Sequence, residues 1–174
     1  TYRWTGSISG PINAATVTAS GSGAISNSPQ NTGNVDGTVT YTITPAGPGG
    51  ALGTCAGASR NYVVTVHPVP TVTAPNQTIC SGQSSSVSIL STPNSVAGTT
   101  FTWTVVGVNV TGASAGSGAV ISQALTSTNG TTNGTATYTI TASANGCAGP
   151  TTDVSIVTVN PVPVITDPAT HLQT

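Results

Sequence analysis

Apolar and polar residues alternate along several short stretches of this chain. The clearest stretch is 135–141 (TATYTIT), and 100–106 (TFTWTVV) and 153–159 (DVSIVTV) follow the same rule. A two-residue period places every second side chain on one face of a β-strand, so each stretch predicts a strand with one buried face. No stretch shows the period of about 3.6 residues that marks an amphipathic helix.

Residues 71–163 are expected to contain about seven such strands, which is the number in a small β-sandwich. Asn129-Gly130 and Asn133-Gly134 mark turns between them, because Asn and Gly adopt positive φ at low cost. Short strands separated by frequent turns predict an all-β protein with antiparallel sandwiches of immunoglobulin-like architecture. The expected strands are 71–74, 86–90, 100–106, 108–110, 119–125, 135–141 and 153–159.

The same pattern occurs twice in the chain. Residues 37–44 (GTVTYTIT) return almost unchanged as 134–141 (GTATYTIT), and Trp4 returns as Trp103. Markers that recur in one order indicate tandem copies of a single module. Three further pairs keep that order: GSGA at 21–24 and 116–119, CAG at 55–57 and 147–149, and PVP at 68–70 and 161–163.

The repeat divides the chain into three parts. Residues 1–70 are expected to form a partial sandwich domain, 71–163 a complete one, and 164–174 a linker and the start of a next repeat. The first copy has no counterpart of 79–99, which holds one strand and one cysteine of the second copy. A sandwich without that strand has an open apolar groove, which either upstream chain or a strand from a neighbouring molecule would fill.

Charged residues are rare: they make up 3% of the chain, and the formal net charge is −1. We do not expect nucleic-acid binding, because neutralising the phosphates needs clustered Lys or Arg. No apolar run approaches the roughly 18 residues of a membrane-spanning helix, so membrane insertion is not expected either. Disorder is also rejected, because the apolar residues are patterned rather than scattered.

The three cysteines are Cys55, Cys80 and Cys147. We predict a disulfide between Cys80 and Cys147 within the complete copy, which implies an oxidising, extracytoplasmic setting. Cys55 is the counterpart of Cys147 and is expected to be unpaired in this fragment. No Cys or His pair has the spacing of metal ligands, so no metal site is expected.

The remaining titratable groups do not predict catalysis or a cofactor. General acid–base chemistry needs two groups facing one site, and a nucleophile needs a positioned base. Here the acids lie apart in the sequence and both histidines lie in linker or tail segments, so we expect a protein that is not an enzyme. The groups concerned are Asp36, Asp153, Asp167, His67 and His171.

Several motifs shared by the two copies resemble a known family. The segments 41–45 (YTITP), 64–70 (VTVHPVP) and 78–82 (TICSG), together with the CAG segments, are similar to the PKD-like repeats of giant Bacteroidetes cell-surface proteins. These include gliding-motility adhesins exported by type IX secretion. The resemblance implies immunoglobulin-like sandwiches in long arrays at the bacterial cell surface, with roles in adhesion or motility. The strand 101–104 (FTWT) lacks the acids that other PKD domains carry there.

Two functions remain open at this stage. The first is a structural repeat of an extracellular stalk, fibre or adhesin, which assembles into a filament by strand complementation between protomers. Its partners would be neighbouring repeats or protomers of the same protein. The alternative is a carbohydrate- or surface-binding adhesion module, for which exposed aromatics such as Tyr2 and Tyr62 are the candidates.

Overall fold

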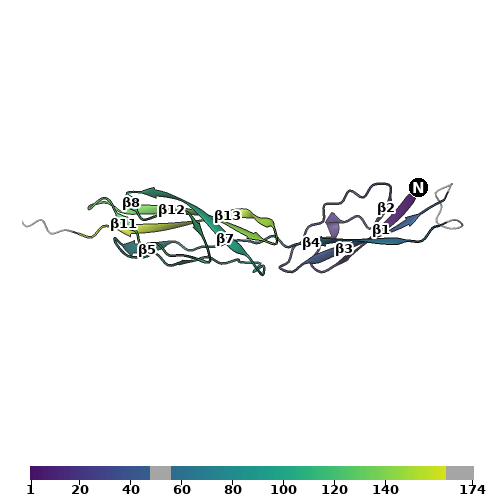
Figure 1. Ribbon diagram of the computed structural model, residues 1–174, viewed down its shortest axis with the longest axis horizontal. Coiled ribbons are helices and arrows are strands. Elements are labelled where there is room, and N and C mark those ends of the chain that lie inside the picture. The colour runs from purple at the N-terminus through teal and green to yellow at the C-terminus, as the bar shows by residue number, and fades with distance from the viewer. Residues whose placement is uncertain (48–55, 164–174) are drawn as a thin grey trace, which may run out of the picture. The chain divides into compact units, whose positions relative to one another are not determined.

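The computed structural model describes residues 1–47 and 56–163, and these residues divide into two compact units. The first unit consists of Thr1–Thr71, Pro93–Thr99 and Ser143–Pro150, and the second of Val72–Thr92, Thr100–Ala142 and the residues from Thr151 onward. Figure 1 shows that strands account for nearly all the regular structure in both. Each unit is described below by itself.

The second unit contains a five-stranded sheet in the order β5-β13-β12-β7-β9. Two long strands, β12 (Gly134–Ala144) and β13 (Cys147–Asn160), lie at its centre. The turn between them is Asn145-Gly146, and both residues have positive φ (51° and 78°). That conformation matches the twist of a two-residue hairpin and is adopted readily by Asn-Gly. The other strands are β5 (Gln77–Cys80), β7 (Thr100–Val108) and β9 (Gly116–Ser117).

Two small sheets complete the second unit. One pairs β6 (Val87–Ser88) with β10 (Val120–Ile121), and the other pairs β8 (Val110–Thr111) with β11 (Thr126–Ser127). Alternate residues of the long strands are buried against this second layer, which confirms the prediction of an all-β sandwich. The buried core consists of Val72, Ala74, Ile79, Val87, Ile89, Phe101, Trp103, Ile121, Leu125, Ala136, Tyr138, Ile140, Ala142, Val157 and Val159.

The first unit contains one four-stranded sheet in the order β2-β1-β3-β4. Its strands are β1 (Tyr2–Ser9), β2 (Ser20–Ser22), β3 (Gly37–Pro45) and β4 (Arg60–Val66), and all of its pairings are antiparallel. A single 3₁₀ turn, η1 (Ala14–Thr16), follows β1. The side-chain carbonyl of Asn13 caps this turn by accepting a hydrogen bond from the backbone N–H of Ala15.

The repeated Gly-Ser-Gly segments contribute to the short strands β2 and β9. In each unit the first glycine lies against the indole ring of the repeated tryptophan. A Cβ at Gly21 would be 2.6 Å from Cζ2 of Trp4, and one at Gly116 would be 2.9 Å from Cζ2 of Trp103. Glycine is therefore required at both positions so that the backbone can approach the ring.

Candidate interaction surface

Each of the four strands of the first unit has a counterpart in the second. From the repeated motifs, β1 corresponds to β7, β2 to β9, β3 to β12 and β4 to β13. In the second unit, β5 pairs with the outer side of β13, whereas in the described part of the first unit β4 is the edge of its sheet. An edge strand presents unpaired backbone groups that can bind another strand.

The segment that covers β13 is held by specific contacts. Strand β5 runs parallel to β13, with Val157 opposite Gln77 and Val159 opposite Ile79. Just before β5, the Asp153 carboxylate accepts a hydrogen bond from the backbone N–H of Ala74 at 2.6 Å. The covering segment is therefore bound both through the backbone ladder and by a side chain of β13.

Two further hydrogen bonds attach the covering segment to β13. The Ser155 hydroxyl donates to the carbonyl of Pro75 at 2.6 Å, and the Asn76 side-chain carbonyl accepts from the N–H of Ile156 at 2.8 Å. Ser155 is fully buried. The covered side of β13 is thus polar where it meets the backbone of the covering segment and apolar where it faces the core.

The corresponding side of β4 is open and apolar. Tyr62 and Val64 take the places of Ser155 and Val157, and Tyr62 is 63% exposed. Two adjoining hollows lie on this side, with volumes of about 480 and 190 Å³, and both include Ile25. We call this surface, formed by β4 and the two hollows, the edge groove. The hollows are lined by Tyr2, Ile25, Ile43, Pro45, Ala58, Arg60, Asn27, Pro29, Tyr41, Tyr62 and Val64.

Partial burial in the first unit follows from this open side. Its fully buried cluster consists of Trp4, Ile12, Val39 and Tyr41, and five further apolar residues are only half-buried against it. Ile43 is one of these, although its counterpart Ile140 is fully buried in the second unit. The edge groove therefore exposes residues whose counterparts form a core.

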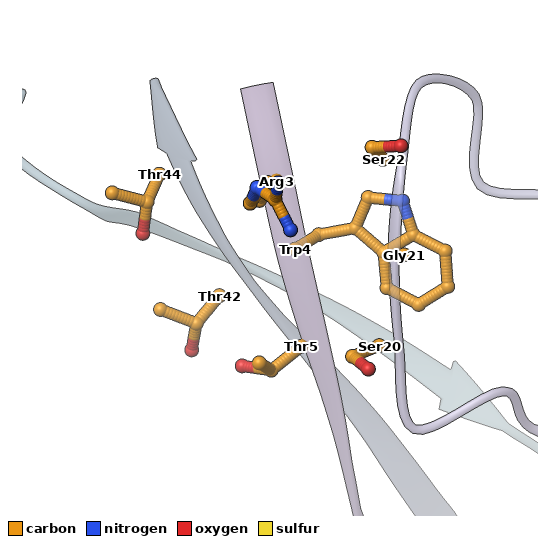
Figure 2. Close-up of a pocket in the computed structure, with 8 residues that line it drawn as sticks. All are labelled: Arg3, Trp4, Thr5, Ser20, Gly21, Ser22, Thr42 and Thr44. Atoms are coloured by element: carbon orange, nitrogen blue, oxygen red, sulfur yellow. The ribbon is translucent and has the colours of Figure 1, made fainter. Parts of the chain in front are cut away.

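A separate hollow of about 370 Å³ is lined by residues of β1, β2 and β3 (Figure 2). Trp4 is 6% exposed and its ring packs edge-on against Tyr41, with centroids 5.8 Å apart. Its Nε1 has no hydrogen-bond partner in the described structure, whereas Nε1 of Trp103 donates to the carbonyl of Ser114 at 3.2 Å. The hollow is lined by Arg3, Trp4, Thr5, Ser20, Gly21, Ser22, Thr42 and Thr44.

The expected disulfide between Cys80 and Cys147 is not present, and both thiols are free. Cys147 is the first residue of β13, whereas Cys80 lies opposite Asn160, the last. Thirteen steps along a strand separate the two by roughly 40 Å, since a strand rises about 3.3 Å per residue. A disulfide needs Cα atoms within about 7 Å, so strand register excludes this bond. Cys55 lies outside the described residues.

The structure brings together one pair of the candidate acid–base groups. His67 Nδ1 and Asp36 Oδ1 are 2.8 Å apart in an exposed pair, and Asp153 is bound to Ala74. Asp167 and His171 lie outside the described residues. Within the described ranges no three His, Cys, Asp or Glu side chains are grouped closely enough to hold a metal ion.

One buried phenol has a perturbed pKa. Burial raises the pKa of Tyr138 above its usual value of 10.0. Its hydroxyl donates to Oε1 of Gln123 at 2.8 Å, and the other end of that amide donates to the carbonyl of Ser114 at 2.7 Å. This network links β12 to the loop beside Trp103, so its role is structural.

The shared strand framework of the two units is that of a tandem module of immunoglobulin-like architecture. The family model of the PKD-like domain matches residues 1–70 and 77–163, and the chain belongs to that family. No curated protein and no solved structure matches the chain. PKD-like domains are typically extracellular and non-catalytic, and fit a structural or adhesion-type module. In the residues that the structure describes, no helix is long and apolar enough to cross a bilayer.

Proposed function

We propose that this chain is a structural repeat of an extracellular stalk, fibre or adhesin on a bacterial surface, and that it assembles as a filament by strand complementation. One observation carries the proposal. Two copies of one strand framework are present, and the side that is covered by a strand in the second is an open apolar groove in the described residues of the first. An exposed apolar strand edge is the type of surface that accepts a strand from another chain.

The low charge of the chain supports the same function. With 3% charged residues, neighbouring copies repel one another weakly, so close side-by-side or end-to-end packing is tolerated. Charged residues commonly protect edge strands against pairing, and on β4 only Arg60 is charged. The shared family motifs support placement on a Bacteroidetes cell with export by type IX secretion.

Assembly is tested by sedimentation velocity and negative-stain electron microscopy of the purified chain across a wide concentration range. Linear or helical particles that lengthen with concentration are expected. A monodisperse monomer at every concentration would exclude the filament. Surface placement is tested separately, by labelling intact cells of the source organism with an antibody to the chain.

A second candidate function is glycan binding at the hollow beside Trp4. It is favoured by the hydroxyls of Thr5, Thr42 and Thr44, which line the hollow together with Trp4. Sugars are bound by such combinations of aromatic rings and hydroxyl or amide groups. Reproducible binding on a glycan array that is lost in a Thr42→Val/Thr44→Val variant would support it, with Tyr62→Ser as the variant outside the hollow.

A further inference from the structure

The hollow beside Trp4 is lined by polar side chains that form two rows across β2, β1 and β3. Residues that lie directly opposite each other in a sheet share a face, so the members of each row lie on the same side. The rows are Ser22–Arg3–Thr44 and Ser20–Thr5–Thr42. Figure 2 shows Arg3 between the hydroxyl side chains of its row. The hollow therefore presents several hydroxyls around one cation.

Two of these hydroxyls are held in place from β4 and the residue before it. Oγ1 of Thr42 donates to Oδ1 of Asn61 at 2.9 Å, and Oγ1 of Thr44 is 2.8 Å from Oγ of Ser59. A hydroxyl that donates its own proton keeps its lone pairs for another donor. Thr42 is thus oriented as an acceptor for a hydroxyl of a ligand.

The charge of the hollow has one sign. No acidic side chain is among its lining residues. In the described part of the first unit the one acid is Asp36, which contacts His67 at the start of β3, whereas Thr44 lies near the end of that strand. The eight residue steps from Asp36 to Thr44 span roughly 26 Å of strand. The hollow therefore has a positive potential, which favours an anionic ligand.

We propose that this hollow binds an acidic saccharide, with the sugar carboxylate on Arg3 and the sugar hydroxyls on the Thr and Ser side chains around it. The inference rests on glycan binding at the hollow, the second candidate function, and names its ligand class. Guanidinium and carboxylate are planar groups that form two parallel hydrogen bonds. A uronic acid carries one carboxylate and several hydroxyls on one ring. The hollow, at about 370 Å³, falls within the range of small-ligand sites.

The second unit provides a matched variant on the same framework. Thr102 takes the place of Arg3 there, and its hydroxyl is 2.8 Å from that of Thr141. Arg3→Thr therefore gives the first unit the residue of the second, and it should weaken binding of an acidic oligosaccharide by roughly tenfold, because a charged hydrogen-bonded pair is lost. Arg3→Lys should recover only part of this loss, since an ammonium group does not form the paired bonds.

The ligand class is tested on an array of uronic-acid, sialylated, sulfated and neutral glycans, followed by calorimetry of the full chain with the strongest acidic ligand. Its methyl ester removes the charge but keeps the ring hydroxyls, and should bind about tenfold more weakly. Raising the salt concentration should also weaken binding of the acid, because exposed charges are screened. A tri-glutamate peptide should bind weakly, since it lacks the ring hydroxyls. Equal binding of the peptide, or a preference for sulfated over carboxylated sugars, would overturn the assignment.

Net charge is controlled with Arg3→Thr/Val162→Arg, which moves the cation to an exposed residue of the second unit. This variant should bind as weakly as Arg3→Thr, and full recovery would mean that the attraction is not specific to the hollow. Circular dichroism confirms that each variant is folded.

The outcomes separate the ligand class from glycan binding itself. If acid and ester bind equally and Arg3→Thr has no effect, while Thr42→Val/Thr44→Val abolishes binding, the acidic ligand is wrong and glycan binding at the hollow stands. If no glycan on the array binds, both fail, and the proposed filament is unaffected.

Discussion

The two units have the same strand framework but different cores. In the second unit the residues on the inner face of β12 and β13, such as Ile140 and Val157, are fully buried. In the first unit their counterparts Ile43 and Val64 are half-buried beside the edge groove. Both sequences alternate in the same way, so alternation alone does not determine burial. What differs in the described residues is whether further segments cover the sheet, since β5 and β6 of the second unit have no counterpart in the first.

This comparison has a direct thermodynamic consequence. Burial of apolar area contributes roughly 25 cal/mol per Å², so a side chain that stays half-exposed contributes much less to folding than its buried counterpart. The chain has two tryptophans, one in each unit, at Trp4 and Trp103. Fluorescence of single-tryptophan variants therefore reports the unfolding of each unit separately.

The largest expected difference is between aligned isoleucines. Ile140→Ala should destabilise the second unit by about 2–5 kcal/mol, because it leaves a cavity in a closed core. Ile43→Ala should cost the first unit only about 1 kcal/mol, because its side chain is already partly in water. Urea unfolding followed by tryptophan fluorescence measures both. Equal losses would show that the first unit is as closed as the second.

Replacing the glycine that lies against the tryptophan ring should reduce stability by a similar amount in both units. Gly21→Ala and Gly116→Ala should each cost about 1–3 kcal/mol, because the added methyl overlaps the tryptophan ring and forces it to move. Gly130→Ala is the control, since a Cβ there meets nothing within 4 Å. Thermal unfolding of the three variants provides the measurement. A cost confined to one unit would mean that the two tryptophans are packed differently.

The next largest loss of stability is expected when a hydrogen bond that attaches the covering segment is removed. Ser155→Ala should destabilise the second unit by about 1–2 kcal/mol, because it removes the hydroxyl of a fully buried residue that donates to the carbonyl of Pro75. The aligned change in the first unit, Tyr62→Ala, should leave stability within about 0.5 kcal/mol, since Tyr62 is largely exposed. Chemical denaturation distinguishes the two. A large loss for Tyr62→Ala would contradict an open edge groove.

The smallest effect concerns pH and Tyr138. Because its folded pKa is raised by burial, the unfolded chain ionises first as pH rises above about 10, and the stability contribution of the neutral phenol is lost as pH passes through the raised value. Tyr138→Phe should remove this part of the alkaline loss and cost about 1 kcal/mol at neutral pH, through the lost bond to Gln123. Unfolding curves at pH 7 and pH 10.5 test this. An unchanged alkaline slope would mean that another group causes the loss.

Sequence patterns predicted the long strands well and the short ones poorly. The expected strand 71–74 forms only an isolated bridge from Thr73 to Leu90, and β5 was not expected. The expected strand 153–159 is the second half of β13, which begins at Cys147. The expected strand 119–125 is reduced to β10, and the residues after it make an isolated bridge from Ala124 to Ser84 instead. Where a strand ends depends on which partner strand is available, and that partner is distant in sequence.

The edge groove was partly foreseen. The missing counterpart of 79–99 indicated an open side on the first copy, but the sequence did not show that β4 is the exposed edge. The hollow beside Trp4 carried no signal in the sequence, because its residues come from β1, β2 and β3. A bond was expected between Cys80 and Cys147 because both lie in the complete copy. Membership of one copy, however, does not show at which end of a sheet each residue lies.

The sequence by itself determined the class of fold, the tandem repeat and the faces of the long strands, because alternation and turn residues act over a few neighbouring positions. The tertiary structure alone decided that β5 pairs in parallel with β13, that two cysteines of one module lie at opposite ends of a strand, and that β4 has an open side. These features depend on which distant segments meet, and the free energy of that choice comes from burial and backbone pairing across the whole sheet rather than from local preference.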